Sequence, residues 1–251
     1  MLFKEAFTLL AVESSAGPAS CAILRVENGQ QRILAQSFVN TGLTHSQTLL
    51  PLINHTIADA GLSFENIDAL AVAVGPGSFT GVRIGVSAVK GLAFPQNLPC
   101  VPVSTLAGMA RRFEGVPFNG RIVTAMDARC NQIYTASFCL GNGVVTRLTP
   151  DEALPMTEVK DRLLEKSGPI LLVGDGAALC YEQWKEEIKD LCLAPPALRY
   201  QHAAGVALEA VISIQRDNII SAAELLPAYL RLPQAERELR SKQQQNQTSK
   251  V

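Results

Sequence analysis

Hydrophobic positions at the start of the chain predict three strands. Residues 7–13 are mostly apolar, which is typical of a buried strand. Two further runs, 19–27 and 31–39, flank the pair Asn28-Gly29, which is a strong short-range signal for a β-hairpin. The chain is therefore expected to open with a strand followed by a hairpin.

A helix, a strand and a second helix are predicted next. Between residues 45 and 60 apolar side chains recur at helical spacing, and Gly61 ends the pattern. Residues 67–74 form a continuous apolar run, as expected of a strand covered on both faces. A glycine-rich loop at 75–80 then leads into a predicted helix over 81–94.

The rest of the chain repeats a looser form of this alternation. Its predicted elements, in chain order, are a strand at 101–103, a helix from the N-cap Ser104 to 111, strands at 121–127 and 132–140, a helix at 158–165, a strand at 170–173, and helices at 177–189 and 203–214. This order predicts an α/β protein with mixed sheets flanked by helices.

The predicted elements divide into two lobes with a cleft between them. Residues 1–103 and about 203–232 are expected to form the first lobe, and 104–202 the second. Residues 233–251 are rich in Gln, Lys, Arg and Glu, so they are predicted to be a disordered tail.

Composition and charge narrow the class of protein. The chain has 251 residues, 47% of them hydrophobic, which is enough for two cores. Its net charge of −1 argues against autonomous binding of nucleic acid, because phosphate neutralisation supplies most of that affinity. None of the six cysteines forms a C-x-x-C pair, and no apolar run approaches the roughly 20 residues of a membrane span. These features predict a cytoplasmic protein.

The glycine-rich segment 75–85, GPGSFTGVRIG, is the most distinctive stretch of the chain. A strand, a glycine loop and a helix N-terminus can together bind an anion. The candidate residues for an anion or nucleotide loop are Ser14, Ser15, Gly75, Gly77 and Ser78.

The spacing of this segment matches no standard phosphate motif. Gly81 comes one residue too late for the dinucleotide fingerprint. Val82 and Arg83 stand where a P-loop needs Lys and Ser or Thr, and the G-x-S-x-G pattern of a nucleophile elbow is also missing. A tight strand-to-helix turn is therefore the alternative interpretation.

Small and apolar residues on the two helices that flank this loop suggest an interaction surface. Such helices could form a bundle with the same helices of another chain, or they could pack within their own lobe. The predicted interface residues are His45, Leu49, Leu52, Ile53, Thr56, Gly81, Gly85, Ala88, Val89 and Leu92.

Few residues suggest catalysis. His45 and His55 are too far apart to chelate a metal on one helix face, and His202 is distant in the sequence. Acids that lie at or near the ends of predicted strands could bind magnesium or act as bases, although they could equally cap turns; they are Glu13, Asp68, Asp127 and Asp175. No Ser-His-Asp triad is discernible, so no catalytic residue and no metal site are predicted.

Six segments spread along the chain carry a family resemblance. They are LLAVESS at 9–15, HSQTLLPLI at 45–53, GPGSFTGVRIG at 75–85, MDAR at 126–129, GDG at 174–176 and LLPAYLR at 225–231. Together they resemble the TsaB family, also called YeaZ, of bacterial tRNA-modification partners. The resemblance implies a two-lobed fold like that of actin, Hsp70 and the sugar kinases. It also implies kinship with TsaD, the enzyme that transfers the threonylcarbamoyl group.

The resemblance also implies a function. A TsaB-like chain binds and activates TsaD, together with the ATPase TsaE, in forming N6-threonylcarbamoyladenosine next to the anticodon of tRNAs that read codons starting with A. Docking is expected through the two helices that flank the glycine loop, with a homodimer through the same face when the chain is alone. Contact with tRNA is expected within the complex. The chain itself would require no cofactor, and weak binding of ATP stays open.

Three departures from active relatives imply a non-catalytic subunit. TsaD-like enzymes carry two metal-binding histidines, whereas here His45 is followed by Leu49 at the second position. The first strand usually ends in Asp-Thr-Ser and here ends in Glu-Ser-Ser at 13–15; Gln132 replaces the Glu that often precedes Tyr134. The alternatives are an ATP-binding enzyme of the sugar-kinase type and a metallopeptidase, which the missing histidine disfavours.

Overall fold

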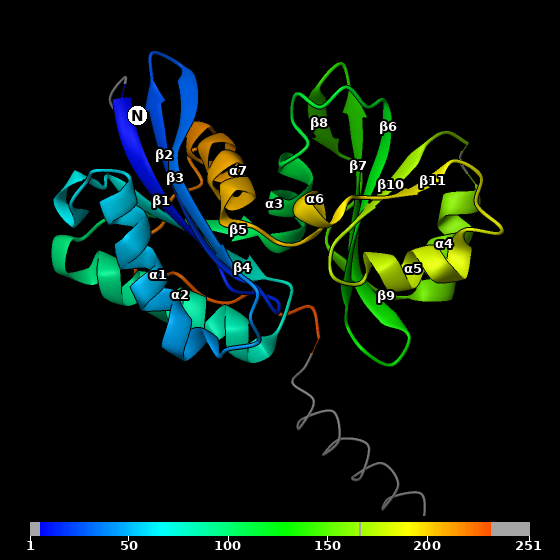
Figure 1. Ribbon diagram of the computed structural model, residues 1–251, viewed down its shortest axis with the longest axis horizontal. Coiled ribbons are helices and arrows are strands. Elements are labelled where there is room, and N and C mark those ends of the chain that lie inside the picture. Colours follow the sequence, from blue (N-terminus) through cyan, green and yellow to red (C-terminus); the bar gives the residue numbers. More distant parts are fainter. Residues whose placement is uncertain (1–5, 166, 232–251) are drawn as a thin grey trace, which may run out of the picture.

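The computed structural model describes residues 6–165 and 167–231. Two α/β lobes lie side by side, and the described chain returns to the first lobe after it has built the second (Figure 1). The predicted tail at 233–251 lies outside the described residues. None of the described helices is long and apolar enough to cross a membrane.

The first lobe is built on a five-stranded mixed sheet with the order β3-β2-β1-β4-β5. Its strands are β1 (Ala6–Glu13), β2 (Ala19–Glu27), β3 (Gln30–Val39), β4 (Ala69–Gly75) and β5 (Cys100–Ser104). β1, β2 and β3 pair antiparallel, while β1, β4 and β5 run parallel. The predicted hairpin is confirmed, since Asn28 and Gly29 both have the positive φ that a tight turn between strands requires, 51° and 76°.

Helices cover both faces of this sheet. One face packs against α1 (His45–Asp59) and α2 (Phe79–Ala93), and the other against α7 (Ala203–Gln215). Alternation along β1 explains the two layers: Leu10 and Val12 point to α1 and α2, whereas Leu9 and Ala11 point to α7. Two short 3-10 turns, η1 (Phe64–Asn66) and η2 (Phe94–Gln96), lie in the connections that follow α1 and α2, respectively.

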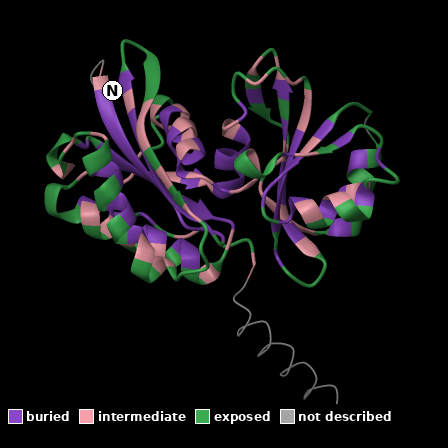
Figure 2. Ribbon diagram, viewed as in Figure 1, coloured by how far each residue is buried: buried purple, intermediate pink, exposed green. Residues whose placement is uncertain are grey.

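The second lobe is built on a six-stranded sheet with the order β11-β10-β6-β7-β8, and β9 pairs with β7. Its strands are β6 (Gly120–Asp127), β7 (Gln132–Gly141), β8 (Val144–Arg147), β9 (Glu152–Pro155), β10 (Ile170–Val173) and β11 (Leu191–Leu193). α3 (Thr105–Arg111) packs on one face, α4 (Met156–Leu164) and α5 (Ala177–Trp184) on the other, and α6 (Pro196–Arg199) follows β11. Figure 2 shows the buried residues gathered in the two sheets and on the helix faces against them.

The two sheets share one topology. If β9 is set aside, β6, β7, β8, β10 and β11 lie in the same spatial order as β1 to β5, with the first strand at the centre. In both lobes the first strand pairs antiparallel with the second and parallel with the fourth. The predicted two-lobed α/β class with mixed sheets is therefore confirmed.

The predicted elements differ from the structure mainly at short segments and helix ends. β8, β9, β11 and α6 were not predicted, because three or four residues carry too little periodicity. α2 begins at Phe79, two residues before the predicted start, because the Ser78 hydroxyl caps it by accepting from the Gly81 N–H. α5 ends at Trp184 and not at 189. The predicted N-cap Ser104 is confirmed, since its hydroxyl accepts from the Ala107 N–H.

Candidate functional site

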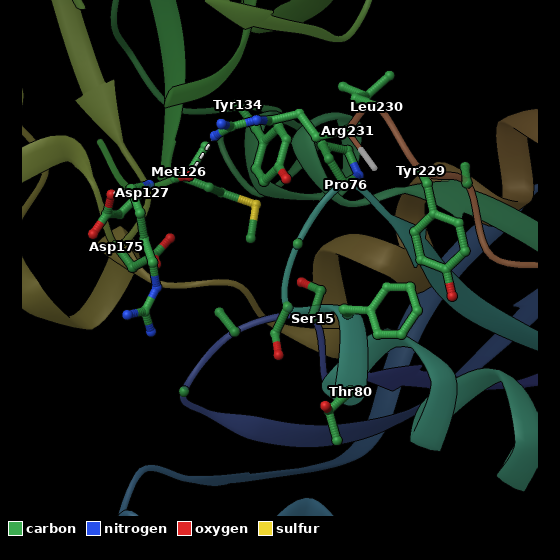
Figure 3. Close-up of a pocket in the computed structure, with 18 residues that line it drawn as sticks. Ser15, Pro76, Thr80, Met126, Asp127, Tyr134, Asp175, Tyr229, Leu230 and Arg231 are labelled. Carbon is green, nitrogen blue, oxygen red and sulfur yellow. Dashed lines mark hydrogen bonds between the residues drawn. The ribbon is translucent and has the colours of Figure 1, made fainter. Parts of the chain in front are cut away.

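A cleft of about 640 Å³ lies between the lobes. The first lobe contributes the turn after β1 and the loop after β4, and the second lobe contributes the turn after β6 and the loop after β10. Residues 228–231 line it as well. In Figure 3, Asp127 and Asp175 lie on one side of the cleft, and Thr80 and Tyr229 lie on the other. The carboxyl ends of the central parallel strands meet here, which is where α/β sheets commonly bind ligands.

The loops after β4 and β10 are built alike. Gly75-Pro76-Gly77 begins at the last residue of β4 and Gly174-Asp175-Gly176 directly follows β10, so the two triplets occupy equivalent places in the two lobes. The first glycine of each has a φ that side chains rarely adopt, 123° at Gly75 and 118° at Gly174. A Cβ atom there would overlap a carbonyl oxygen, that of Ala228 and that of Ala125, respectively.

The turn after β1 packs directly onto the glycine-rich segment. The Ser78 N–H donates to the Ser15 carbonyl oxygen at 2.6 Å, and the Ser14 hydroxyl donates to the Gly81 carbonyl at 2.9 Å. A Cβ atom at Gly77, Gly81 or Gly85 would overlap atoms of Ser14 or Ser15. These glycines therefore let the turn lie against the first turns of α2, as the tight-turn interpretation requires.

The five residues of the predicted anion loop are therefore brought together. Ser14, Ser15, Gly75 and Gly77 pack tightly at the wall of the cleft, while the Ser78 side chain is exposed. The Ser15 Oγ is buried and has no hydrogen-bond partner among the described residues. Anion binding at this loop stays a prediction.

An acid ends the first strand of each lobe. Glu13 is 1% exposed, and its Oε1 accepts from the Ser15 N–H at 2.6 Å. Asp127 makes the matching contact, since its Oδ1 accepts from the Arg129 N–H at 2.7 Å, but it is exposed. Burial raises the pKa of the Glu13 carboxyl to about 7, because desolvation disfavours its charged form.

Asp175 completes the acidic part of the site. Its side chain is open to the cleft, and its Oδ1 accepts from Gln201 Nε2 at 2.6 Å. The protein atoms that surround the rest of the carboxyl raise its pKa by desolvation, and the charge of Asp127 adds to this effect. Gln201 is fully buried, and its Oε1 has no partner within the part of the chain that the structure describes. Sequence analysis missed Gln201, because a lone Gln after a short helix carries no signal.

Other predicted acids and histidines have structural contacts. Asp68 accepts from the Thr8 N–H at 2.7 Å and so ties β1 to the start of β4. His202 caps α7 by accepting from the Ala204 N–H, and it stacks on Phe38 at 5.3 Å. Burial lowers the pKa of His202 to about 4. Within 6–165 and 167–231, no three His, Cys, Asp or Glu side chains come together as a metal site.

The C-terminal segment 227–231, here called the strap, lies across the mouth of the cleft. The Ala228 N–H donates to the Val74 carbonyl at 2.7 Å in the first lobe. In the second lobe the Arg231 guanidinium donates to the Ala128 carbonyl at 2.6 Å, shown as the dashed line in Figure 3. The strap therefore joins the two lobes. Its sequence was noted as a motif, but its position could not be read from the residues.

A second hollow, of about 540 Å³, lies between the first halves of α1 and α2 and is here called the α1–α2 groove. Its lining residues are His45, Ser46, Leu49, Leu50, Phe79, Thr80, Arg83, Ile84, Ser87 and Ala88. Leu50 is 50% exposed. Phe79 and Thr80 line both the groove and the cleft, so the two hollows adjoin at the first turn of α2.

The predicted interface residues are largely on the inner faces of these helices. Seven of the ten are buried, most of them against the first sheet: Leu49, which also lines the groove, Leu52, Ile53, Thr56, Gly81, Gly85 and Val89. His45, Ala88 and Leu92 are half-buried. Helical spacing identifies the most apolar stripe, which here faces the protein's own core. The accessible residues Leu50, Arg83 and Ser87 were not predicted.

The structure shows where His45 lies, the residue at the first position of the metal-binding pair that the family resemblance implies for active relatives. His45 Nε2 lies 2.7 Å from the Ala16 carbonyl oxygen at the turn after β1. Leu49, one helical turn later, is 1% exposed and belongs to the core under α1. The two side chains therefore serve the packing of α1 against the first lobe.

Comparisons with known proteins agree on one family. The family model described as "TsaD: tRNA N6-adenosine threonylcarbamoyltransferase" matches residues 40–239. The tRNA threonylcarbamoyladenosine biosynthesis protein TsaB of Bacillus subtilis is 31% identical over 181 residues, which is 72% of this chain and 76% of that protein. The protein of the same name from Haemophilus influenzae is 41% identical over 128 residues, about half of each chain (51% and 52%).

A solved structure extends the comparison to the fold. The structure titled "YeaZ from Pseudomonas aeruginosa" superposes with a TM-score of 0.74 at 28% identity. The match covers 89% of this chain and 100% of that one. Both lobes are therefore shared with that protein.

Proposed function

Because the chain belongs to the TsaB family of tRNA threonylcarbamoyladenosine biosynthesis proteins, which is related to TsaD, we propose that it is a non-catalytic subunit that binds and activates a TsaD-like transferase. The observation that carries this proposal is the α1–α2 groove. It is an open, partly apolar hollow on the outside of the first lobe, next to the mouth of the cleft.

The groove has the properties of a docking surface for helices. Leu50 is half-exposed, and Ile84 and Ala88 are half-buried on the facing side of α2. Apolar side chains grouped around a hollow lose contact with water when a partner covers them, and this favours association. Two adjacent helices can extend into a bundle with two helices of a second protein, which is the arrangement that we propose.

Several features support a role without catalysis. Leu49 stands where the TsaD-like pattern has its second metal histidine, and it lies in the core of the first lobe. Glu13 is buried and turned to its own backbone, so it is not presented to a substrate. We therefore propose that the transfer of the threonylcarbamoyl group takes place on the partner and that this chain shapes or stabilises that partner.

The remaining partners follow from the family resemblance. We propose that a TsaE-like ATPase joins the pair, that tRNA is contacted within the complex, and that the isolated chain forms a homodimer through the same groove. A net charge of −1 supports an indirect role with tRNA, since it offers no general attraction for phosphate.

Two matched substitutions test the docking surface. Leu50 and Leu179 are both helical leucines of similar exposure, 50% and 45%, on the groove and on the second lobe, respectively. Leu50→Asp is expected to weaken binding to the purified TsaD-like protein by about 100-fold, because a charge replaces apolar contact area. Leu179→Asp is expected to leave the affinity unchanged. Calorimetry measures both, and thermal unfolding checks that both variants are folded.

Reconstitution tests the activity itself. Modification of tRNA would be measured with the TsaD-like protein, the TsaE-like ATPase and a source of threonylcarbamoyl-adenylate, with and without this chain. Product that forms equally well without the chain would refute the proposal. Turnover of ATP by the isolated chain would favour the sugar-kinase alternative instead.

A further inference from the structure

Arg83 on α2 is held in one direction by two aromatic side chains. Its guanidinium carbon lies 3.7 Å from the centre of the Phe79 ring, and its Nε donates to the Tyr229 hydroxyl at 2.7 Å. The rings of Phe79 and Tyr229 stack with their centres 4.9 Å apart. An arginine on an exposed helix face ordinarily samples many rotamers, and these contacts remove that freedom before any partner arrives.

Tyr229 can restrain Arg83 because the strap is itself fixed on both sides. The backbone of Ala228 is bonded to Val74 in the first lobe, and Arg231 is bonded to Ala128 in the second. Gly75 leaves room for the Ala228 carbonyl, which a Cβ atom at that position would overlap. These contacts on either side of Tyr229 fix the backbone that carries its ring.

Arg83 lines the α1–α2 groove and meets no acid there. None of the ion pairs found among the described residues includes Arg83. α2 contains no Asp or Glu, and the acid of α1 is its last residue, Asp59, about 20 Å along the helix from the groove-lining end. With its Nε bonded to Tyr229, the guanidinium keeps its two terminal nitrogens for another group, and two parallel N–H groups match a carboxylate.

We propose that Arg83 is the charged anchor of the docking groove, that it pairs with an Asp or Glu of the partner, and that Tyr229 is the residue that positions it. This inference rests on the proposed function and names the chemistry of the partner's surface: a carboxylate bordered by apolar side chains that meet Leu50, Ile84 and Ala88. A preorganised cation favours a partner that supplies the missing acid, because less side-chain freedom is lost on binding.

The experiment is a double-mutant cycle on the full chain, with affinity for the purified TsaD-like protein measured by calorimetry at low and high salt. Arg83→Gln is expected to weaken binding about 100-fold and to reduce its salt dependence. Tyr229→Phe, which keeps the stacked ring and removes the hydroxyl, is expected to weaken binding about fivefold. The double variant should bind as Arg83→Gln does, within about twofold, because Tyr229 acts through Arg83.

Lys90 provides a matched control. Its Nζ donates to the carbonyl oxygens of Ala223 and Leu225, both at 3.1 Å, so it holds the residues just before the strap and does not line the groove. Lys90→Gln is expected to leave the affinity within about twofold of the wild type. An equal loss in Lys90→Gln and Tyr229→Phe would show a general loosening of this stretch and would overturn the positioning role.

Other outcomes separate this inference from the proposed function. If the wild-type chain binds the TsaD-like protein and Arg83→Gln binds it equally well, the inference is refuted and the proposed function is not affected. If the losses of affinity from the two single substitutions add up in the double variant, Tyr229 does not act through Arg83 and is not its positioning residue. If Arg83→Gln weakens self-association and not binding to the TsaD-like protein, Arg83 serves contact with a second copy of this chain, and the inference about the TsaD-like partner is overturned. A wild-type chain that does not bind the TsaD-like protein at all would refute both.

Discussion

The two walls of the cleft share the same backbone features, but their side chains differ in exposure. Each lobe has an acid at the end of its central strand that accepts from the N–H two residues on, and each has a G-x-G triplet at the end of the strand that pairs parallel with it. In the first lobe the acid, Glu13, is buried, and the middle residue of the triplet is Pro76, also buried. In the second lobe the acid, Asp127, and the middle residue, Asp175, are both open to the cleft.

The first lobe therefore forms a closed wall, in which the acid and the triplet are packed against protein atoms. The second lobe forms an open wall, in which the acid and the middle residue of the triplet reach the cleft. The closed wall packs the turn after β1 onto α2 and leaves the outer side of that helix to form the α1–α2 groove. The open wall brings two carboxylates to the cleft. The same strand topology can therefore support a surface for partners on one lobe and a polar lining of the cleft on the other. A few side chains make the difference between the two lobes.

The largest effect is expected where the two walls are alike. Gly75→Ala and Gly174→Ala are each expected to lower the free energy of unfolding by about 3 kcal/mol or more, because both glycines have strongly positive φ and face a carbonyl oxygen that a Cβ would overlap. Urea denaturation measures the loss. Similar losses in both variants would support the equivalence of the two triplets.

Gly91 offers the control for these substitutions. It lies inside α2, and a Cβ atom there would meet no atom within 4 Å. Gly91→Ala is expected to raise the free energy of unfolding by about 0.5–1 kcal/mol, since alanine is the better helix former. A loss at Gly91 as large as at Gly75 would mean that backbone conformation is not the cause.

The next effect concerns Glu13, the buried acid of the closed wall, and its dependence on pH. The pKa of Glu13 is raised by burial from 4.5 to about 7, so the folded protein holds this proton more tightly than the unfolded chain. The contribution of Glu13 is therefore most favourable below pH 4.5 and is lost as the pH rises to about 7, by up to about 3 kcal/mol. Glu13→Gln removes this dependence while keeping an acceptor for Ser15.

The measurement is the difference in unfolding free energy between Glu13→Gln and the wild type at pH 5 and pH 8. The variant should gain stability relative to the wild type as the pH rises. A difference that stays the same at pH 5 and pH 8 would contradict burial of the Glu13 carboxyl as the cause of its raised pKa.

The sequence predicted the parts of this comparison that depend on local pattern. The apolar runs that became β1, β4 and β6, the hairpin at Asn28-Gly29 and the cap at Ser104 all follow from periodicity or turn chemistry. The tight turn after β4 was one of the two interpretations of the glycine segment. The order of the predicted elements indicated two lobes, and the family resemblance implied their likeness to actin, Hsp70 and the sugar kinases.

Long-range relations could not be predicted. Gly75-Pro76-Gly77 and Gly174-Asp175-Gly176 are about a hundred residues apart, and the sheet order is needed to see that they correspond. Most of the residues predicted for the interface belong to apolar stripes that face the first sheet, because periodicity finds an apolar stripe without telling what covers it. Their place in an interface stays a prediction. Tyr229 lines the cleft, and the buried Gln201 bonds to the cleft residue Asp175, through contacts that no local pattern encodes.

The smallest effect concerns the reactivity of the cysteine thiols in the two lobes. Burial raises the pKa of Cys21 and Cys180 to about 12 and that of Cys100 to about 11, so these thiols have very little thiolate at neutral pH. The exposed cysteines, Cys130, Cys139 and Cys192, all belong to the second lobe. A short pulse of iodoacetamide, followed by peptide mass spectrometry, should label these three and spare the others. Rapid labelling of Cys21 or Cys100 would show that the first lobe opens more readily than its packing implies.

The return of the chain to the first lobe has a consequence for how the protein is made. α7 supplies the cover for one face of the first sheet, yet it follows the whole second lobe in the sequence. A ribosome adding about 5–20 residues per second needs roughly 5–20 s to pass from β5 to α7. During that interval the apolar face that includes Leu9, Leu24 and Val101 has no permanent cover, so the nascent chain is expected to need the shelter of a chaperone until α7 emerges.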